Sequence, residues 1–214
     1  MTNISTQCGG VLVNDLVTII RQNRDYLSEI DGAIGDGDHG INMAKGFSLC
    51  SEKLDDRLTL AQAFDTLSDA LMEGIGGSMG PLYGSLFMGI ADSIRDKTTL
   101  SAEDFAAMLR AGLHELQDIS EAGVGDKCLM DSLIPAVEAA EHTAADGYPL
   151  MLSAIRQAAV QGRDSTRDMV AKIGRASRLG ERSRGVLDAG AVSCCLLLTQ
   201  MAISAERALN THTA

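Results

Sequence analysis

Three aspartates lie within a span of eight residues in the first fifth of the sequence. They are Asp31, Asp36 and Asp38, and small residues separate them, chiefly glycine. At neutral pH three carboxylates this close repel one another, so that protonation or a bound cation must relieve the repulsion. Hard oxygen ligands select Mg²⁺ or Ca²⁺ over zinc. The spacing therefore predicts a metal site with these three aspartates as its ligands.

Two further readings of the aspartate segment compete with a magnesium site. An EF-hand calcium loop needs a bidentate glutamate at its twelfth position, where Asn42 stands when counting starts at Asp31. A solvated Asp-Gly turn is the plainer reading, because both residue types favour turns. Mg²⁺ typically takes one or two carboxylates and completes its shell with water and substrate phosphates. The spacing alone thus leaves a phosphate-binding magnesium site and an ordinary turn open.

The elements that must position these aspartates are predicted to be helices. Ala, Leu and Met are abundant, proline occurs three times and tryptophan is absent, a composition that favours helix. Apolar residues recur at helical spacing in eight segments, which are 10–28, 39–53, 60–71, 81–96, 101–116, 128–143, 148–173 and 191–209. No strand pattern of convincing length occurs. We therefore predict an all-α fold, an eight-helix antiparallel up-and-down bundle or closed barrel, as a single domain of residues 1–214.

Four glycine-rich loops are predicted to meet at one end of this fold. If consecutive helices run antiparallel, alternate connections fall at the same end. The connections after the first, third, fifth and seventh helices are residues 29–38, 74–80, 119–127 and 174–190. Loops on a rigid scaffold commonly carry function. The helix count therefore predicts a site that contains the three aspartates at this rim.

Composition narrows the class of protein further. The chain has 214 residues, of which 18 are basic and 29 acidic, giving a formal net charge of -11, and 45% are hydrophobic. Such an acidic chain is a poor candidate for nucleic-acid binding, which needs Lys and Arg to neutralise phosphates. The N-terminus has no secretory pattern, and no run reaches the roughly 18 apolar residues of a membrane span. The five scattered cysteines indicate reduced thiols. We expect a cytoplasmic protein with neither nucleic-acid nor membrane partners.

Motifs in all four loops resemble one family, the nucleotide-binding L subunit of dihydroxyacetone kinase. The same module forms the C-terminal domain of single-chain ATP-dependent dihydroxyacetone kinases. The matching segments are DGAIGDGDHGINM (31–43), GGSMGPLYG (76–84), GDK (125–127) with Asp131, and GRASRLGERS (174–183) with DAGA (188–191). They span nearly the whole chain in order. The resemblance implies a barrel of eight antiparallel helices, in agreement with the helix count.

The resemblance also implies roles for individual residues. Asp31, Asp36 and Asp38 would bind two Mg²⁺ ions that clamp nucleotide phosphates. The implied nucleotide contacts are His39, Gly40, Ile41, Asn42, Ser78, Met79, Leu129, Arg175, Asp188, Ala189 and Gly190. Arg175 is also the implied catalytic residue, stabilising charge on the transferring phosphoryl group. The chain departs from the family at Met79, Cys128, Val186 and Ala189, where Ser, Thr, His and Pro are usual. These departures concern the nucleotide pocket and leave the aspartates intact.

A lysine and a cluster of arginines near the rim can each be interpreted in two ways. Lys127 is either a phosphate ligand or a partner in a loop salt bridge. Arg175 belongs to a cluster with Arg178, Arg182 and Arg184, which is either a solvated face or a set of contacts to phosphate or a partner. In a chain this acidic, the second reading of the arginines is favoured.

The function implied by the resemblance is phosphoryl transfer with bound Mg²⁺ and ADP or ATP. The chain would pass phosphate to a triose held on a separate K subunit, and a phosphohistidine protein would recharge ADP in systems linked to the phosphotransferase system. A homo-oligomer is compatible with this role. Three alternatives remain: an L-type subunit of a kinase for another ketose such as a tetrulose, a nucleotide-binding regulatory module, and a Mg²⁺-dependent phosphohydrolase.

Overall fold

The computed structural model describes residues 3–211, and these form an all-α protein, as predicted. The α-helices are α1 (Gly10–Gln22), α2 (Arg24–Ile34), α3 (His39–Ser51), α4 (Leu60–Gly74), α5 (Met79–Ile94), α6 (Ala102–Ile119), α7 (Met130–Thr143), α8 (Tyr148–Ser165) and α9 (Ala189–Thr211). Three 3₁₀ helices add η1 (Ala144–Asp146), η2 (Thr166–Asp168) and η3 (Arg175–Ser183). Two short strands, β1 (Ile4–Ser5) and β2 (Thr99–Leu100), pair antiparallel.

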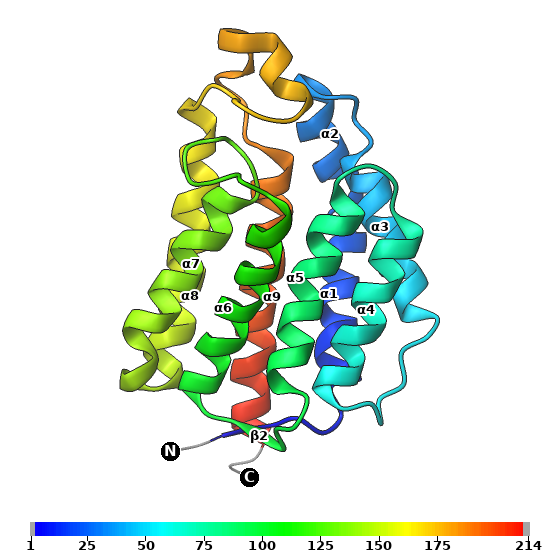
Figure 1. Cartoon of the computed structure of the whole chain (residues 1–214), viewed down its shortest axis with the longest axis vertical. Coiled ribbons are helices and arrows are strands. Elements are labelled where there is room, and N and C mark those ends of the chain that lie inside the picture. Colours follow the sequence, from blue (N-terminus) through cyan, green and yellow to red (C-terminus); the bar gives the residue numbers. More distant parts are fainter. Residues whose placement is uncertain (1–2, 212–214) are drawn as a thin grey trace.

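The long helices lie side by side along the long axis of the molecule (Figure 1). Helix α1 packs on α3, and each helix from α3 to α8 contacts the next, until α9 packs back on α1. The connections that follow α2, α4 and α6 lie at one end together with η3, whereas β2 lies at the other end (Figure 1). We call the end that carries these three connections and η3 the loop end.

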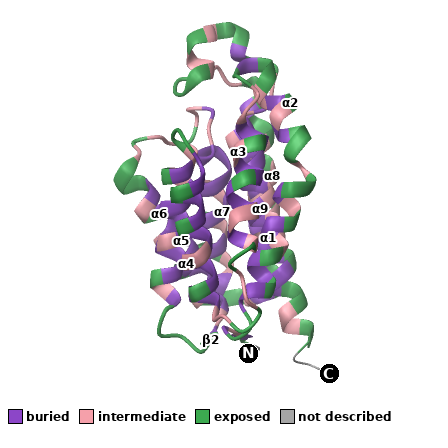
Figure 2. Ribbon diagram, turned by 90° about the vertical axis from the view of Figure 1, so that its right-hand side faces the viewer, coloured by how far each residue is buried: buried purple, intermediate pink, exposed green. Residues whose placement is uncertain are grey.

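Buried side chains fill the space between the helices and form one apolar core. Figure 2 shows the buried residues on the inward faces of the helices and the exposed ones outside. The ring of Phe87 stacks on Phe64 with a centroid distance of 5.6 Å and meets the edge of Phe47 at 6.3 Å. These rings tie α3, α4 and α5 together, and aromatic pairs of this kind contribute beyond their buried area. The core is therefore a rigid support for the loop end.

The predicted first helix and the loop after it were wrong in their boundaries. The helix breaks at Asn23, where φ is -102° and ψ is 11°, and then continues as α2 through Ile34. The Asn23 side chain donates a hydrogen bond to the carbonyl of Ile19 at 2.8 Å, a local bond that competes with regular helix. Asp31 consequently lies in the last turn of α2, and the described residues hold nine α-helices where eight were predicted.

The predicted helix 148–173 was also too long. Helix α8 ends at Ser165, and the chain turns through η2. The hydroxyl of Ser165 donates to the carbonyl of Gly162 at 2.7 Å, and that of Thr166 donates to the carbonyl of Arg163 at 2.6 Å. Such side-chain bonds to the backbone offer an alternative to further helix. Residues 166–188, the η3 segment, therefore form one long excursion over the loop end.

Helix α9 is long and largely apolar. By length and composition alone it could cross a membrane, since an 18-residue window within it has a mean hydropathy of 1.4. Yet 67% of that window is buried inside the protein. The apolar composition of α9 is thus accounted for by its place in the core, where its partners include α1, α7 and α8.

Candidate functional site

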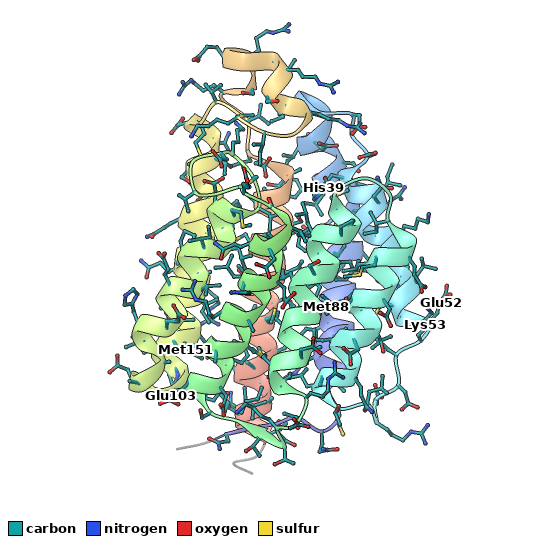
Figure 3. The ribbon with its side chains drawn as sticks, in the orientation of Figure 1. His39, Glu52, Lys53, Met88, Glu103 and Met151 are labelled. Atoms are coloured by element: carbon teal, nitrogen blue, oxygen red, sulfur yellow. The ribbon has the colours of Figure 1, made fainter. Side chains whose placement is uncertain are left out.

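A cleft of about 700 Å³ opens at the loop end, and all four predicted rim loops contribute to it. The lining residues fall into four groups, one from each loop and the residues next to it: Asp31, Ile34, Gly35, Asp36, Asp38, His39 and Asn42; Gly76, Gly77, Ser78, Met79, Leu82 and Tyr83; Ile119, Ser120, Lys127, Cys128 and Leu129; and Ile173, Gly174, Arg175, Ala176, Asp188, Ala189 and Gly190. Figure 3 shows His39 near this end of the molecule. The structure thus brings together residues as far apart in the chain as Asp31 and Gly190, as the alternation of loops predicted.

The three aspartates converge in this cleft. Asp31, Asp36 and Asp38 each place a carboxylate oxygen within 4.8 Å of the others. The turn between α2 and α3 passes through Gly37 at φ +77°, a conformation that favours glycine. Asp38 stands at the N-cap of α3, yet its side chain makes no capping hydrogen bond, so that its carboxylate is available to a ligand. This donor set fits a hard divalent cation.

Four helices begin at the cleft and direct their N-termini toward it. The lining includes His39 at the start of α3, Met79 at the start of α5, Leu129 just before α7 and Ala189 at the start of α9. Free backbone N–H groups and the helix dipole make such N-termini favourable for anions. The cleft therefore combines an anionic corner suited to cations with four positive helix ends suited to phosphate.

Two arginines of the cluster make different contacts in the structure. Arg175 reaches from the start of η3 to the carboxylate of Asp36 and forms an ion pair with it. Arg184 bonds within its own segment, to the carboxylate of Glu181 and the carbonyl of Asp168. Arg175 is thus the arginine of the cluster that lines the cleft, and its guanidinium already lies against one of the three carboxylates.

Lys127 follows neither of its two predicted readings. Its ammonium group donates to the carbonyl oxygens of Met169 at 3.2 Å, Ser183 at 2.6 Å and Val186 at 2.7 Å. The residue is 2% exposed, and burial lowers the pKa of its ammonium group. Because a lysine has three N–H donors, all of them are used by the backbone. Lys127 therefore holds the two stems of the η3 segment together.

Two acids, the buried Asp131 and the half-buried Asp188, organise the backbone beside the cleft. Asp131 accepts hydrogen bonds from the backbone N–H groups of Gly125 at 2.6 Å and Cys128 at 2.8 Å. Asp188 accepts from the N–H of Ala191 at 2.7 Å, and burial raises the pKa of its carboxyl to about 7. Sequence reasoning gave Asp131 a place in a motif but no role. Its signal was the position three residues after Cys128, from which a side chain in the first turn of α7 can reach back to a backbone N–H ahead of the helix.

His39 lies at the back of the cleft and is 8% exposed. Its Nε2 atom lies 2.9 Å from the hydroxyl of Ser193, and that hydroxyl lies 2.6 Å from the hydroxyl of Tyr83. Burial lowers the pKa of His39 to about 4, so that the ring is neutral at pH 7. Tyr83 and Ser193 were missed by sequence reasoning, because they lie 110 residues apart and no local pattern links them.

Two residues that the resemblance placed at the nucleotide do not line the cleft. Ile41 is 48% exposed and borders a shallow groove beside Arg21 and Lys45. Gly40 lies against α2, where an added Cβ would overlap the carbonyl oxygen of Arg24 and lie 2.8 Å from the backbone nitrogen of Ser28. The packing of α3 on α2 thus accounts for glycine at position 40.

We expect Gly40→Ala to destabilise the fold by about 2 kcal/mol, because the methyl group would force α3 away from α2. Urea unfolding followed by circular dichroism measures this as a lower transition midpoint. Gly76→Ala is the matched control, since an added Cβ there meets no atom within 4 Å. A Gly40→Ala midpoint equal to that of the control would show that the helices do not pack this closely.

The departures from the family pattern fall mainly inside the cleft. Met79, Cys128 and Ala189 are among its lining residues. Val186 is not, but its carbonyl accepts a hydrogen bond from Lys127. Burial raises the pKa of the Cys128 thiol to about 12, so that it is protonated at neutral pH. The wall of the cleft is therefore altered at three positions, while the carboxylates remain.

The all-α scaffold brings a carboxylate cluster suited to a cation and four helix N-termini suited to an anion into one cleft. The chain belongs to the DAK2 domain family, whose model matches residues 33–203. The match includes the aspartates at 36 and 38 and every later segment of the cleft.

Curated relatives support this assignment, and a solved structure shares the fold. The chain is 37% identical over 205 residues to the ADP-binding subunit DhaL of PEP-dependent dihydroxyacetone kinase 2 from Listeria innocua, covering 94% of this chain and 95% of that protein. It is 32% identical to the corresponding Escherichia coli subunit, covering 96% of each. The dihydroxyacetone kinase of C. freundii in complex with AMP-PNP and Mg²⁺ superposes with a TM-score of 0.68 at 23% identity, over 91% of this chain and 33% of that one.

Proposed function

We propose that this protein is the ADP-binding, phosphoryl-transferring subunit of a dihydroxyacetone kinase. The observation that carries the proposal is the convergence of Asp31, Asp36 and Asp38 in a cleft bordered by four helix N-termini. Relatives of matching length named as ADP-binding DhaL subunits support the same function.

The residues of the cleft divide the work of holding a nucleotide. We infer that the three aspartates hold two Mg²⁺ ions, which when bound would neutralise charge on nucleotide phosphates. The N–H groups at the starts of α5 and α9, around Ser78, Met79 and Gly190, would bind phosphate oxygens. Leu129, Ala189 and Asn42 would line the remainder of the pocket. ADP is the expected resident nucleotide, with ATP as its charged form.

Arg175 is the proposed catalytic residue. Its guanidinium lies at the carboxylates, where it would stabilise charge on a transferring phosphoryl group. We further infer that the sugar is held by a separate K-type subunit and that a phosphohistidine protein recharges the nucleotide, as the names of the PEP-dependent and PTS-dependent relatives suggest.

The finer features of the scaffold follow from the same family. We infer that the long helices close into an antiparallel barrel of eight helical segments, in which α1 and α2 together count as one. We also infer that residues 1–214 are a single domain. The contact of α9 with α1 supports closure. We further propose a cytoplasmic location. A homo-oligomer is compatible with this function, provided that the cleft stays exposed.

A kinase for a tetrulose is the second candidate. The chain is 31% identical over 200 residues to L-erythrulose kinase of Pectobacterium atrosepticum, of which it covers 34%. Because the sugar would be chosen by the K-type partner, both candidates share the same cleft chemistry. A purely regulatory nucleotide module and a phosphohydrolase are less favoured, since the complete carboxylate set and Arg175 are both present.

The test is retention of ADP by the purified chain. We expect ADP to elute with the protein in gel filtration in Mg²⁺ buffer and to separate from it when EDTA is added, because removal of the cation leaves carboxylates facing phosphates. Bound nucleotide is quantified after acid release. Equal retention in both buffers would contradict the metal-dependent site, and release of phosphate from ATP without a partner would favour the phosphohydrolase.

A further inference from the structure

The turn that joins α2 to α3 is arranged around the side chain of Asp31. The backbone carbonyl of Asp31, in the last turn of α2, accepts a hydrogen bond from the N–H of Gly35 at 2.5 Å. Its carboxylate reaches across the turn, where Oδ2 accepts a hydrogen bond from the N–H of His39, the first residue of α3, at 3.3 Å. Asp31 is therefore bonded to both sides of the turn, once through its backbone and once through its carboxylate.

Gly35 leaves free the space that this carboxylate occupies. A Cβ added at Gly35 would lie 2.3 Å from Oδ1 of Asp31, 3.0 Å from its Cγ and 2.9 Å from its carbonyl oxygen. Carbon and oxygen atoms that are not bonded cannot approach to 2.3 Å, so a side chain at position 35 excludes the carboxylate from its present place. The backbone makes no such demand, because φ at Gly35 is -134°, outside the left-handed region that favours glycine. Glycine at position 35 is thus explained by the side chain of Asp31.

The orientation of Asp31 also determines whether three carboxylates meet in the cleft. Asp36 and Asp38 flank Gly37 within the turn, whereas Asp31 reaches their oxygens from the preceding helix. Within residues 3–211 the N–H of His39 is the hydrogen-bond partner of the Asp31 carboxylate, and it engages Oδ2. Oδ1 is left for a cation, and it is also the atom that a side chain at position 35 would displace.

We propose that Gly35 is a positioning residue, which by its lack of a side chain keeps Oδ1 of Asp31 in place as the third carboxylate ligand of the metal site. This inference rests on the metal binding included in the proposed function. Mg²⁺ demands near-ideal octahedral geometry, whereas Ca²⁺ accepts flexible arrangements of oxygen ligands. A displaced carboxylate therefore weakens binding of Mg²⁺ more than binding of Ca²⁺, so that Gly35 also favours Mg²⁺ at this site.

The first arm of the test examines the turn without cation or nucleotide. In Gly35→Ala the N–H of His39 should lose its acceptor, which NMR detects as an upfield shift of the amide proton and as exchange with solvent that is about tenfold faster or more. Asp31→Ala should give the same two changes. Gly32→Ala is the matched control on the same helix, because an added Cβ there meets no atom nearer than the Cα of Gly37 at 3.7 Å. An unchanged His39 amide in Gly35→Ala would overturn the proposal, because the carboxylate would not have moved.

The second arm measures cation binding by isothermal titration with MgCl₂ and separately with CaCl₂, in the absence of nucleotide. Gly35→Ala should weaken binding of Mg²⁺ by about 10- to 100-fold, the range for losing a group that orients a metal ligand. Binding of Ca²⁺ should weaken less, so that the ratio of the two affinities falls by about threefold or more. Gly32→Ala should match the wild type with both cations. A general loosening of the turn would lower both affinities together, so an unchanged ratio would refute the positioning role.

A double variant separates an effect through Asp31 from any other effect of the added methyl group. Gly35→Ala, Asp31→Ala and the double variant should bind Mg²⁺ equally weakly, within about twofold, because each lacks the same ligand. If the added Gly35→Ala weakened Asp31→Ala by about tenfold more, Gly35 would act elsewhere and the proposal would fail. A wild-type protein that binds neither cation, with the His39 amide behaving as expected, would instead refute the metal site of the proposed function and support the placement of Asp31 by Gly35.

Discussion

Replacing Asp38 by asparagine should weaken binding of ADP with Mg²⁺ by at least about 100-fold, equivalent to roughly 3 kcal/mol. The substitution removes one of three negative charges that meet within 4.8 Å and replaces a carboxylate by a neutral amide. Asparagine is as good an N-cap residue as aspartate, and Asp38 makes no side-chain capping bond, so that α3 should form as before. The loss is therefore expected in ligand binding and not in folding.

Isothermal titration with ADP at fixed Mg²⁺ measures this effect, and thermal unfolding monitors the fold in parallel. Asp25→Asn is the matched control, because the Asp25 side chain on α2 is 95% exposed and only approaches Arg24 at 3.7 Å. It should leave both quantities unchanged. If Asp38→Asn retained ADP as tightly as this control, the aspartates could not be the cation ligands, and the site would have to be sought elsewhere.

The parts of this protein that sequence reasoning predicted are those with a local or periodic signal. Helical spacing of apolar residues located every long helix, and the alternation of loops placed four distant segments at one cleft. The break at Asn23 was missed because it depends on one side-chain bond to Ile19 rather than on periodicity. Gly32 was read as part of a loop, although Ile30 and Ile34 continue the buried face of α2.

The contacts that hold the loops around the cleft could not be predicted from the sequence, for a different reason. Lys127 meets carbonyls that lie 42 to 59 residues further along the chain. Every residue has a backbone carbonyl whatever its type. The sequence therefore gives no signal that distinguishes a lysine bonded to three carbonyls from any other lysine. For the same reason a phosphate ligand and a loop salt bridge were the natural alternatives for Lys127.

Lys127→Met should destabilise the protein by about 3–5 kcal/mol, the largest loss of stability that we expect from one side chain near the cleft. Methionine keeps much of the aliphatic stem but removes all three donors. The carbonyls of Met169, Ser183 and Val186 would lose this partner, and the contact to Ser183 is fully buried. Each such loss costs roughly 1–3 kcal/mol. Position 127 has φ +63°, and the backbone strain there is the same for lysine and methionine because both carry a Cβ.

Urea unfolding measures this loss, and hydrogen exchange locates it. Protection should fall first in the η3 segment, residues 166–188, because Lys127 is bonded at both of its stems, and ADP binding should weaken with it since Arg175 and Asp188 belong to that segment. Lys172→Met is the matched control: its side chain is 63% exposed and pairs with Asp126 at 3.4 Å, so the expected change is below about 1 kcal/mol. If the two variants unfolded at the same urea concentration, the three carbonyl bonds would contribute nothing, and the η3 segment would have to be held over the cleft by its remaining contacts, such as the hydrogen bond from the N–H of Ala171 to Ser183.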